Sequence, residues 1–180
     1  MLRYVAFFRG LNIGRPPSPD RDSLEQAFLH AGAPFVCSFH AHGNVVFDAE
    51  NDRTATRVLQ QTSTTLNATG FQQPGFLRPL SRLETLLEQA PFANQQPGDY
   101  HERCVTWLPI NTPVALPTFP LIFPRDDATL LGADDDAIFS VTRLVNNRPG
   151  AVNATLERKL GCPLTSRNWN IITKLVERFA

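Results

Sequence analysis

The sequence has few cysteines and no long apolar run, and each shortage disfavours a class of protein. Its three cysteines, Cys37, Cys104 and Cys162, are an odd number without C-x-x-C spacing. This pattern disfavours a disulfide framework or a zinc ribbon and favours a reducing compartment. No apolar run approaches the length that spans a bilayer, and Arg3 and Arg9 bracket a stretch too short for a signal peptide. We therefore expect a cytoplasmic protein that is not bound to a membrane.

The chain also lacks net charge, with 17 basic and 17 acidic residues. No global field therefore draws it to nucleic acid or to anionic lipid. The charge is unevenly placed, because basic residues exceed acidic ones from Arg143 to the C-terminus. Internal ion pairing is the simplest explanation of this imbalance, and a local anion site is the sharper one.

The first 80 residues predict a ferredoxin-like βαββαβ subdomain. Strands are expected at about 3–9, 35–41, 44–48 and 71–78 from short apolar or β-rich runs bounded by glycine and proline. One helix should start near Asp22, with Glu25 completing a capping box, and a second at Asn51-Asp52. Two βαβ halves joined by a hairpin produce this fold, with both helices on one face of the sheet.

A connecting helix and linker are expected over residues 81–98, and a smaller α+β subdomain over 99–180. Ser81 and Glu84 fit a capping box, and a polar Gly/Pro segment ends at residue 98. In the last part we expect strands at 102–110 and about 137–144, with at most one short edge strand in the proline-rich segment 112–124. A helix from about Pro149 and a last helix capped by Ser166 complete an α+β chain that ends in a helix.

The loop after the first strand is the first candidate site. Arg9, Gly10, Asn12 and Gly14 could present backbone N–H groups as an anion nest, closed by arginine. The alternative is that the glycines only permit the turn and Asn12 caps it. The loop is not a dinucleotide fingerprint, since the third glycine is missing and the helix starts too late, and it has no G-K-[ST] of a P-loop.

The C-terminal segment Ser166-Arg167-Asn168 is the second candidate. At a helix start it would combine free N–H groups with a guanidinium, which suits an anion, and Lys174 lies about two turns further on. A capped terminal helix with Trp169 in the core is the simpler interpretation.

Other chemistry is less well supported. His40 and His42 share a strand face, as metal ligands would, but the sequence offers no identifiable third ligand, and two exposed hairpin histidines are commoner. Tyr4, Phe8 and Phe47 invite an RNA-recognition interpretation, although the RNP1 pattern is absent. No nucleophile motif such as G-x-S-x-G occurs. We expect no metal and no cofactor, and no motif in the sequence indicates a particular reaction.

Several segments together resemble one family: YVAFFRGLNIG (4–14), GNVVF (43–47), LERKLG (156–161) and TSRNWNIITKL (165–175). In this order they are similar to the bacterial domain-of-unknown-function 1697 family. The resemblance implies a ferredoxin-like subdomain followed by a smaller α+β subdomain, and it implies no activity. The chain departs from its relatives at Arg15-Pro16-Pro17, where they continue with glycine and lysine, at His42, where they carry serine, and near Gly150, where they carry a lysine.

The polar residues of these segments lead to a first hypothesis, a small phosphate- or carboxylate-bearing ligand at the junction of the subdomains. The expected binding residues are Arg9, Gly10, Asn12, Gly14, Gly43, Asn44, Arg167, Asn168 and Lys174. The alternatives are a nucleic-acid-binding module that uses the basic C-terminal end, which the zero net charge disfavours, and an interaction or structural protein without a ligand. The sequence does not set the oligomeric state.

Overall fold

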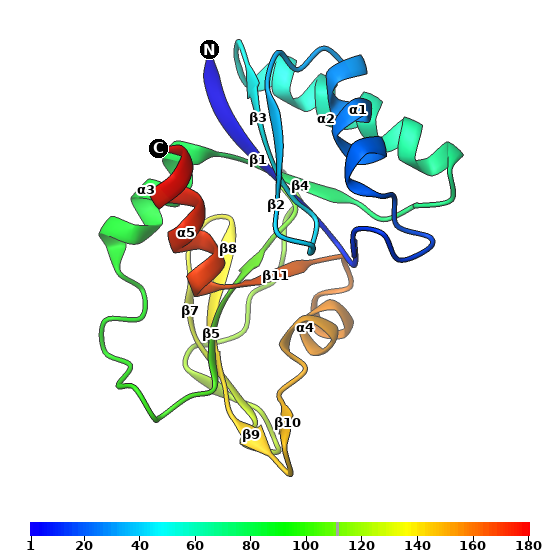
Figure 1. The fold of residues 1–180 in the computed structure, drawn as a ribbon. Helices are drawn as coiled ribbons and strands as arrows, with labels where there is room; N and C mark the ends of the chain where they lie inside the picture. Colours follow the sequence, from blue (N-terminus) through cyan, green and yellow to red (C-terminus); the bar gives the residue numbers. More distant parts are fainter. Residues whose placement is uncertain (111) are drawn as a thin grey trace. The chain divides into compact units, whose positions relative to one another are not determined.

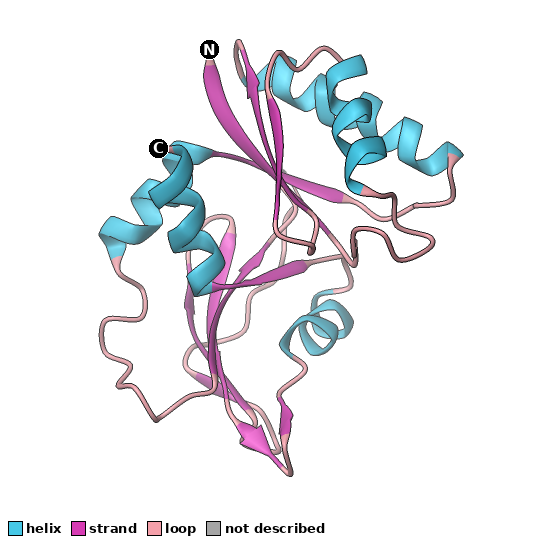
Figure 2. Ribbon diagram, in the orientation of Figure 1, coloured by secondary structure: helices cyan, strands magenta, loops and turns pink. Residues whose placement is uncertain are grey.

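The computed structural model describes residues 1–110 and 112–180, and Figure 2 shows their helices and strands. The chain divides into two compact units. The first unit comprises residues 1–84 with 179–180, and the second comprises residues 85–178. Each unit has its own antiparallel sheet with helices beside it, so the predicted α+β fold is confirmed. None of the helices in the described residues is long and apolar enough to cross a membrane.

The first unit has the ferredoxin-like order of elements. These are β1 (Leu2–Phe8), α1 (Arg21–His30), β2 (Val36–Phe39), β3 (Asn44–Ala49), α2 (Asp52–Ala68) and β4 (Gly75–Pro79). The sheet order is β2-β3-β1-β4 with every pair antiparallel, as two interleaved βαβ halves require. Figure 1 shows α1 and α2 side by side on one face of this sheet.

The core of this unit lies between the sheet and the two helices. Alternate residues of β1, Tyr4, Ala6 and Phe8, point to the helices and are at most 1% exposed. On α2 the predicted apolar face is confirmed, because Ala55, Val58, Leu59, Thr62 and Leu66 are all buried. The predicted start of α2 is also correct, since Asn51 Oδ1 accepts from the amide of Thr54 at 3.0 Å.

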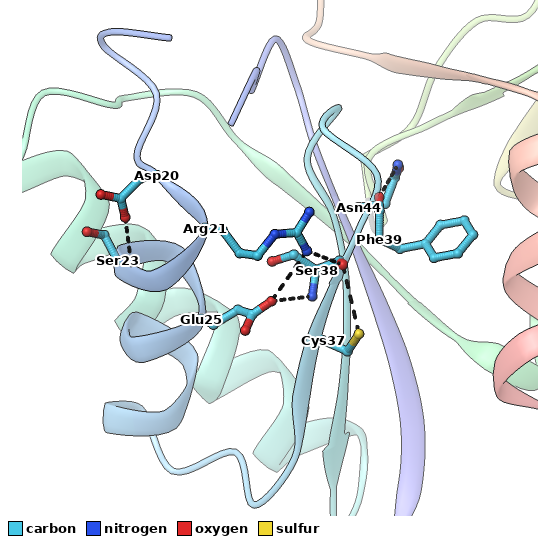
Figure 3. Close-up of polar contacts among 8 residues, drawn as sticks. All are labelled: Asp20, Arg21, Ser23, Glu25, Cys37, Ser38, Phe39 and Asn44. Atoms are coloured by element: carbon cyan, nitrogen blue, oxygen red, sulfur yellow. Dashed lines mark hydrogen bonds and ion pairs between the residues drawn. The ribbon is translucent and has the colours of Figure 1, made fainter. Parts of the chain in front are cut away.

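The predicted capping box of α1 is wrong. Asp20 is the N-cap and accepts from the amide of Ser23 at 2.8 Å. Glu25 instead accepts from the amide of Ser38 at 2.8 Å, while Arg21 Nη1 donates to the Ser38 carbonyl at 2.7 Å (Figure 3). Because β2 is an edge strand, these two side chains occupy backbone groups that would otherwise be open to another strand.

The second unit is built on a five-stranded sheet. After α3 (Leu80–Gln89), within which the division between the units falls, it contains β5 (Glu102–Trp107), β6 (Leu121–Ile122), β7 (Ala128–Ala133) and β8 (Ala137–Thr142). A small hairpin, β9 (Leu144–Val145) and β10 (Arg148–Pro149), then leads to α4 (Val152–Leu160), β11 (Thr165–Asn168) and α5 (Trp169–Phe179). The sheet order is β11-β5-β8-β7-β6.

One face of this sheet carries a core that α4 completes. Val152 and Leu156 of α4 pack with Leu130 of β7 and Ile138 of β8. The only strand in the described part of 112–124 is β6, which is two residues long and lies at the sheet edge, as the prolines predicted.

Two capping predictions are wrong, and two elements of the second unit were not predicted. The sequence pattern did not reveal β7 or the β9–β10 hairpin, whose turn residues Asn146 and Asn147 both have positive φ. Ser81 lies inside α3, which begins at Leu80, so it does not cap that helix. Ser166 belongs to β11, which pairs with β5, and α5 begins at Trp169.

Candidate functional site

Three loops of the first unit meet at one end of its sheet. The amide of Phe8, at the end of β1, donates to the carbonyl of Gly43 at 2.8 Å, and the amide of Arg9 donates to the carbonyl of Pro74 at 3.0 Å. The amide of Ile13 donates to the carbonyl of Ala41 at 2.9 Å. These bonds join the first loop to the β2–β3 turn and to the start of β4. We call residues 9–19, 40–43 and 72–74 the loop end.

The backbone N–H groups of residues 12–15 are bonded within the protein, so they do not contribute to the anion nest that the sequence predicts over Arg9–Gly14. The amide of Asn12 donates to Ser18 Oγ, that of Gly14 to the Pro19 carbonyl, and that of Arg15 to the Asn12 carbonyl. Together with Ile13, four successive N–H groups are therefore satisfied within the protein. A ligand at residues 12–15 would therefore contact side chains.

The side chains of the loop end are basic or neutral. The segments contain Arg9, Arg15, His40 and His42 and no aspartate or glutamate. Arg9 is half-buried and its Nη1 donates to Gln73 Oε1, which links the first loop to the segment before β4. Arg15 and both histidines are exposed. The loop end is thus a positively charged surface without an internal carboxylate.

Asn12 orients one of these histidines. His42 Nδ1 lies 3.2 Å from Asn12 Oδ1. Because an amide oxygen only accepts, Nδ1 carries the proton, and a neutral ring then presents the lone pair of Nε2. Nε2 has no partner among the described residues. A protonated ring would turn Nε2 into a further N–H donor.

Gly43 and Asn44 have structural roles in the same place. Gly43 is buried with φ +64°, and a Cβ there would lie 2.8 Å from Leu11 Cβ. Asn44 is 1% exposed and its Nδ2 donates to the Phe39 carbonyl at 3.1 Å (Figure 3). Gly43 therefore lets the first loop pack on the turn, and Asn44 closes the hairpin from inside.

The C-terminal candidates belong to the second unit. Arg167 is on β11 and not at a helix start, and it is 8% exposed, with Nη1 donating to Thr165 Oγ1 at 2.7 Å and to the Ser166 carbonyl at 2.9 Å. Burial lowers its pKa to about 10. Asn168 Oδ1 accepts from the amide of Asn170 at 2.9 Å, and Lys174 is exposed on α5. The anion-binding role of these three residues stays a prediction.

The aromatic residues of the RNA interpretation are in the core. Tyr4, Phe8 and Phe47 are at most 1% exposed and pack under α1 and α2. They cannot stack on bases without opening the first unit, so this interpretation is wrong. Among the described residues, no three His, Cys, Asp or Glu side chains are placed to hold a metal ion.

The sequence did not indicate one set of polar residues in the second unit. Tyr100, His101 and Arg143 line one cavity, although Arg143 is 42 positions from His101. Strand pairing brings them together, since the amide of His101 donates to the carbonyl of Thr142. No local motif marks them, and only the unexpected pairing of β5 with β8 could have pointed to them.

Comparison with known proteins identifies the family. The sequence model of the family described as "Protein of unknown function (DUF1697)" matches residues 1–116. The chain belongs to this family. The resemblance noted in the sequence is thereby confirmed, and the matched residues of the DUF1697 family model include both the first loop and the β2–β3 turn.

The chain shares its fold with a solved structure of a bacterial protein. It is the structure of conserved bacterial protein SP0830 from Streptococcus pneumoniae, with a TM-score of 0.66 and 17% sequence identity. The alignment covers 98% of this chain and 97% of that one, so the whole fold is shared. No curated protein matches the chain.

Proposed function

We propose that this protein binds a small anionic ligand, phosphate- or carboxylate-bearing, at the loop end of the first unit. The observation that carries the proposal is the gathering there of two arginines and two histidines with no carboxylate. On an ordinary protein surface basic side chains are interspersed with acidic ones, whereas an anion site concentrates basic side chains.

The contacts within the loop end support a defined site. Gln73 holds Arg9 through Oε1, and Asn12 holds His42 through Oδ1, so both cationic or donor groups have fixed directions. Fixing a side chain before binding reduces the entropy lost when the ligand arrives. Arg9 would pair with the anion, the protonated form of the His42 ring would donate a hydrogen bond from Nε2, and exposed Arg15 would contribute charge.

The glycines contribute through conformation. Gly10 and Gly14 have φ +61° and +76° with open space around them, so the chain can turn twice within five residues. This places Arg9 and Asn12 on the same short loop.

A thermal-shift screen tests the proposal, with inorganic phosphate, pyrophosphate and succinate as probes. A probe at a hundred times its Kd should add about 2.7 kcal/mol to the free energy of unfolding. In a domain of this size that corresponds to a rise of roughly 5–10 °C in Tm.

The Arg9→Gln variant should lose this shift. Arg57→Gln is the matched control, because Arg57 is an exposed arginine on α2 of the same unit and should leave the shift unchanged. The proposal fails if no probe raises the Tm, or if the two variants respond alike.

A further inference from the structure

The second unit contains a surface cavity, open to solvent, whose lining residues all lie outside the loop end. Its volume is about 330 Å³, within the range of small-molecule sites. The lining residues come from the segment before β5 and from the connection between β8 and β9: Gly98, Asp99, Tyr100, His101, Arg143 and Leu144. In Figure 1 this connection is the stretch where β8 continues into the β9–β10 hairpin.

Arg143 is anchored in this cavity by one nitrogen only. Its Nη1 donates to Thr129 Oγ1 at 2.9 Å and lies 3.4 Å from Asp126 Oδ1. Nε and Nη2 have no protein acceptor among the described residues. The guanidinium is therefore fixed in orientation while the Nε–Nη2 edge, one of its two-donor edges, is left for a ligand.

Arg3 of the same chain shows how the Nε–Nη2 edge of an arginine binds a carboxylate. Arg3 Nη1 donates to the carbonyl of Phe179 at 3.1 Å, and its Nε and Nη2 donate to the two oxygens of Asp48 at 2.8 and 3.1 Å. The hydrogen bond to Asp48 raises the pKa of Arg3. Arg143 has the first half of this arrangement, an Nη1 fixed by Thr129 and Asp126, but among the described residues no carboxylate binds its Nε–Nη2 edge.

The surroundings of Arg143 suit an organic acid with an apolar body. Tyr100 lines the cavity, and the Arg103 guanidinium lies 5.3 Å from the centre of the Tyr100 ring, where it adds a positive charge to the surroundings. Leu144 is 49% exposed and offers an apolar surface beside the guanidinium. Asp99 also lines the cavity and disfavours a second negative charge on the ligand.

We propose that this cavity binds a small organic monocarboxylate. The carboxylate accepts from Nε and Nη2 of Arg143 as a two-donor fork, and the apolar body lies against the Tyr100 ring and Leu144. The residues of this site are separate from those of the proposed loop-end site, so either proposal can fail without the other.

Benzoate is the probe, and benzamide is its uncharged isostere. Titration of the full isotope-labelled chain, followed by amide chemical shifts in NMR, should show saturable shifts of residues 98–101, 143 and 144 with benzoate and none with benzamide. Arg143→Lys keeps the positive charge and removes the fork, and it should weaken benzoate binding at least tenfold. Arg148→Lys, at an exposed arginine on β10, should bind as the unchanged protein does.

A second variant tests how the fork is positioned. Thr129→Val removes the 2.9 Å acceptor of Nη1 at nearly equal volume and should weaken benzoate binding several-fold, with the shifted residues unchanged. This variant decides the matter if Arg143→Lys does not fold. The proposal is overturned if benzoate and benzamide behave alike, if benzoate shifts residues elsewhere, or if Arg143→Lys binds benzoate as Arg148→Lys does.

Discussion

Gly43 and Leu11 approach so closely that a Cβ on Gly43 would lie 2.8 Å from Leu11 Cβ, a distance that side chains do not tolerate. Leu11 is 2% exposed and belongs to the core under the two helices of the first unit. The contact therefore joins the first loop to the β2–β3 turn at the point where the loop end is assembled. The loop end depends on this glycine for its shape.

Gly43→Ala should destabilise the protein more than Gly10→Ala. Both glycines have φ near +60°, which costs an alanine about 1–2 kcal/mol, but only Gly43 has neighbours where the new methyl group would be. The clash should add about 1–3 kcal/mol. Urea unfolding of the two variants measures the difference directly, and equal losses would show that the packing of Leu11 against the turn has no energetic weight.

The edge of the first sheet gives a second prediction. Glu25→Ala removes the acceptor of the Ser38 amide and should cost about 1–3 kcal/mol, as hydrogen bonds to charged groups do. Glu25→Gln retains an acceptor oxygen and should recover most of the loss. Glu50→Ala, at an exposed position of the same unit, is the control and should be neutral in the same urea titration. If Glu25→Ala leaves the free energy of unfolding unchanged, the hydrogen bond from the Ser38 amide to Glu25 does not stabilise the edge strand β2.

The elements that the sequence predicted well are those whose signals are local. The cap Asn51 and the buried face of α2 depend only on spacing within one helix, and β1 is a continuous apolar run. The strand order of the first unit then follows from the order of elements, because two βαβ halves have few ways to combine. For these reasons the ferredoxin-like half can be predicted from the sequence alone.

The wrong and missing predictions have a common physical cause. In each case the strand that pairs with the segment, and not the segment's own residues, decides its structure. β11 is a polar tetrapeptide that reads as a helix cap, yet pairing with β5 makes it a strand and buries Arg167. β7 contains a glycine at a bulge opposite β8, and this bulge interrupts the alternation of buried and exposed residues by which a strand is recognised. The Arg143 cavity exists only because β8 continues into a hairpin next to the start of β5, and no local pattern of residues expresses that register.

Cys104 should be the least reactive of the three cysteines. Burial, with a smaller effect from the charge of Glu102, raises the pKa of the Cys104 thiol to about 12, which leaves about one thiolate in ten thousand at pH 8. Cys37 and Cys162 are half-buried and more accessible to reagent. Iodoacetamide labelling of the native protein, with peptide mapping, should modify Cys104 only after denaturant is added. Its modification in the native state at a rate similar to Cys37 would show that β5 opens readily.

The bond from Tyr4 to Asp52 gives a prediction on pH. The Tyr4 hydroxyl donates to Asp52 Oδ1 at 2.7 Å, joining β1 to the first turn of α2, and burial together with this bond raises the pKa of Tyr4 to about 12. A phenol whose pKa is higher in the folded than in the unfolded protein stabilises the fold in its protonated form. This contribution is complete below pH 10 and is lost as the pH rises from about 10 to about 12.

The chain's two tyrosines allow a direct measurement of this shift. In Tyr100→Phe the remaining phenol is Tyr4, so the ultraviolet absorbance of tyrosinate should rise with a midpoint at about pH 12. Tyr4→Phe should lower the free energy of unfolding at pH 7 by about 1 kcal/mol, because Asp52 is exposed and water replaces the lost donor. In Tyr4→Phe the loss of stability between pH 10 and 12 should be smaller than in Tyr100→Phe, since the titrating group is gone. A midpoint near pH 10 in Tyr100→Phe would mean that water reaches the Tyr4 hydroxyl and that the bond to Asp52 does not hold β1 against α2.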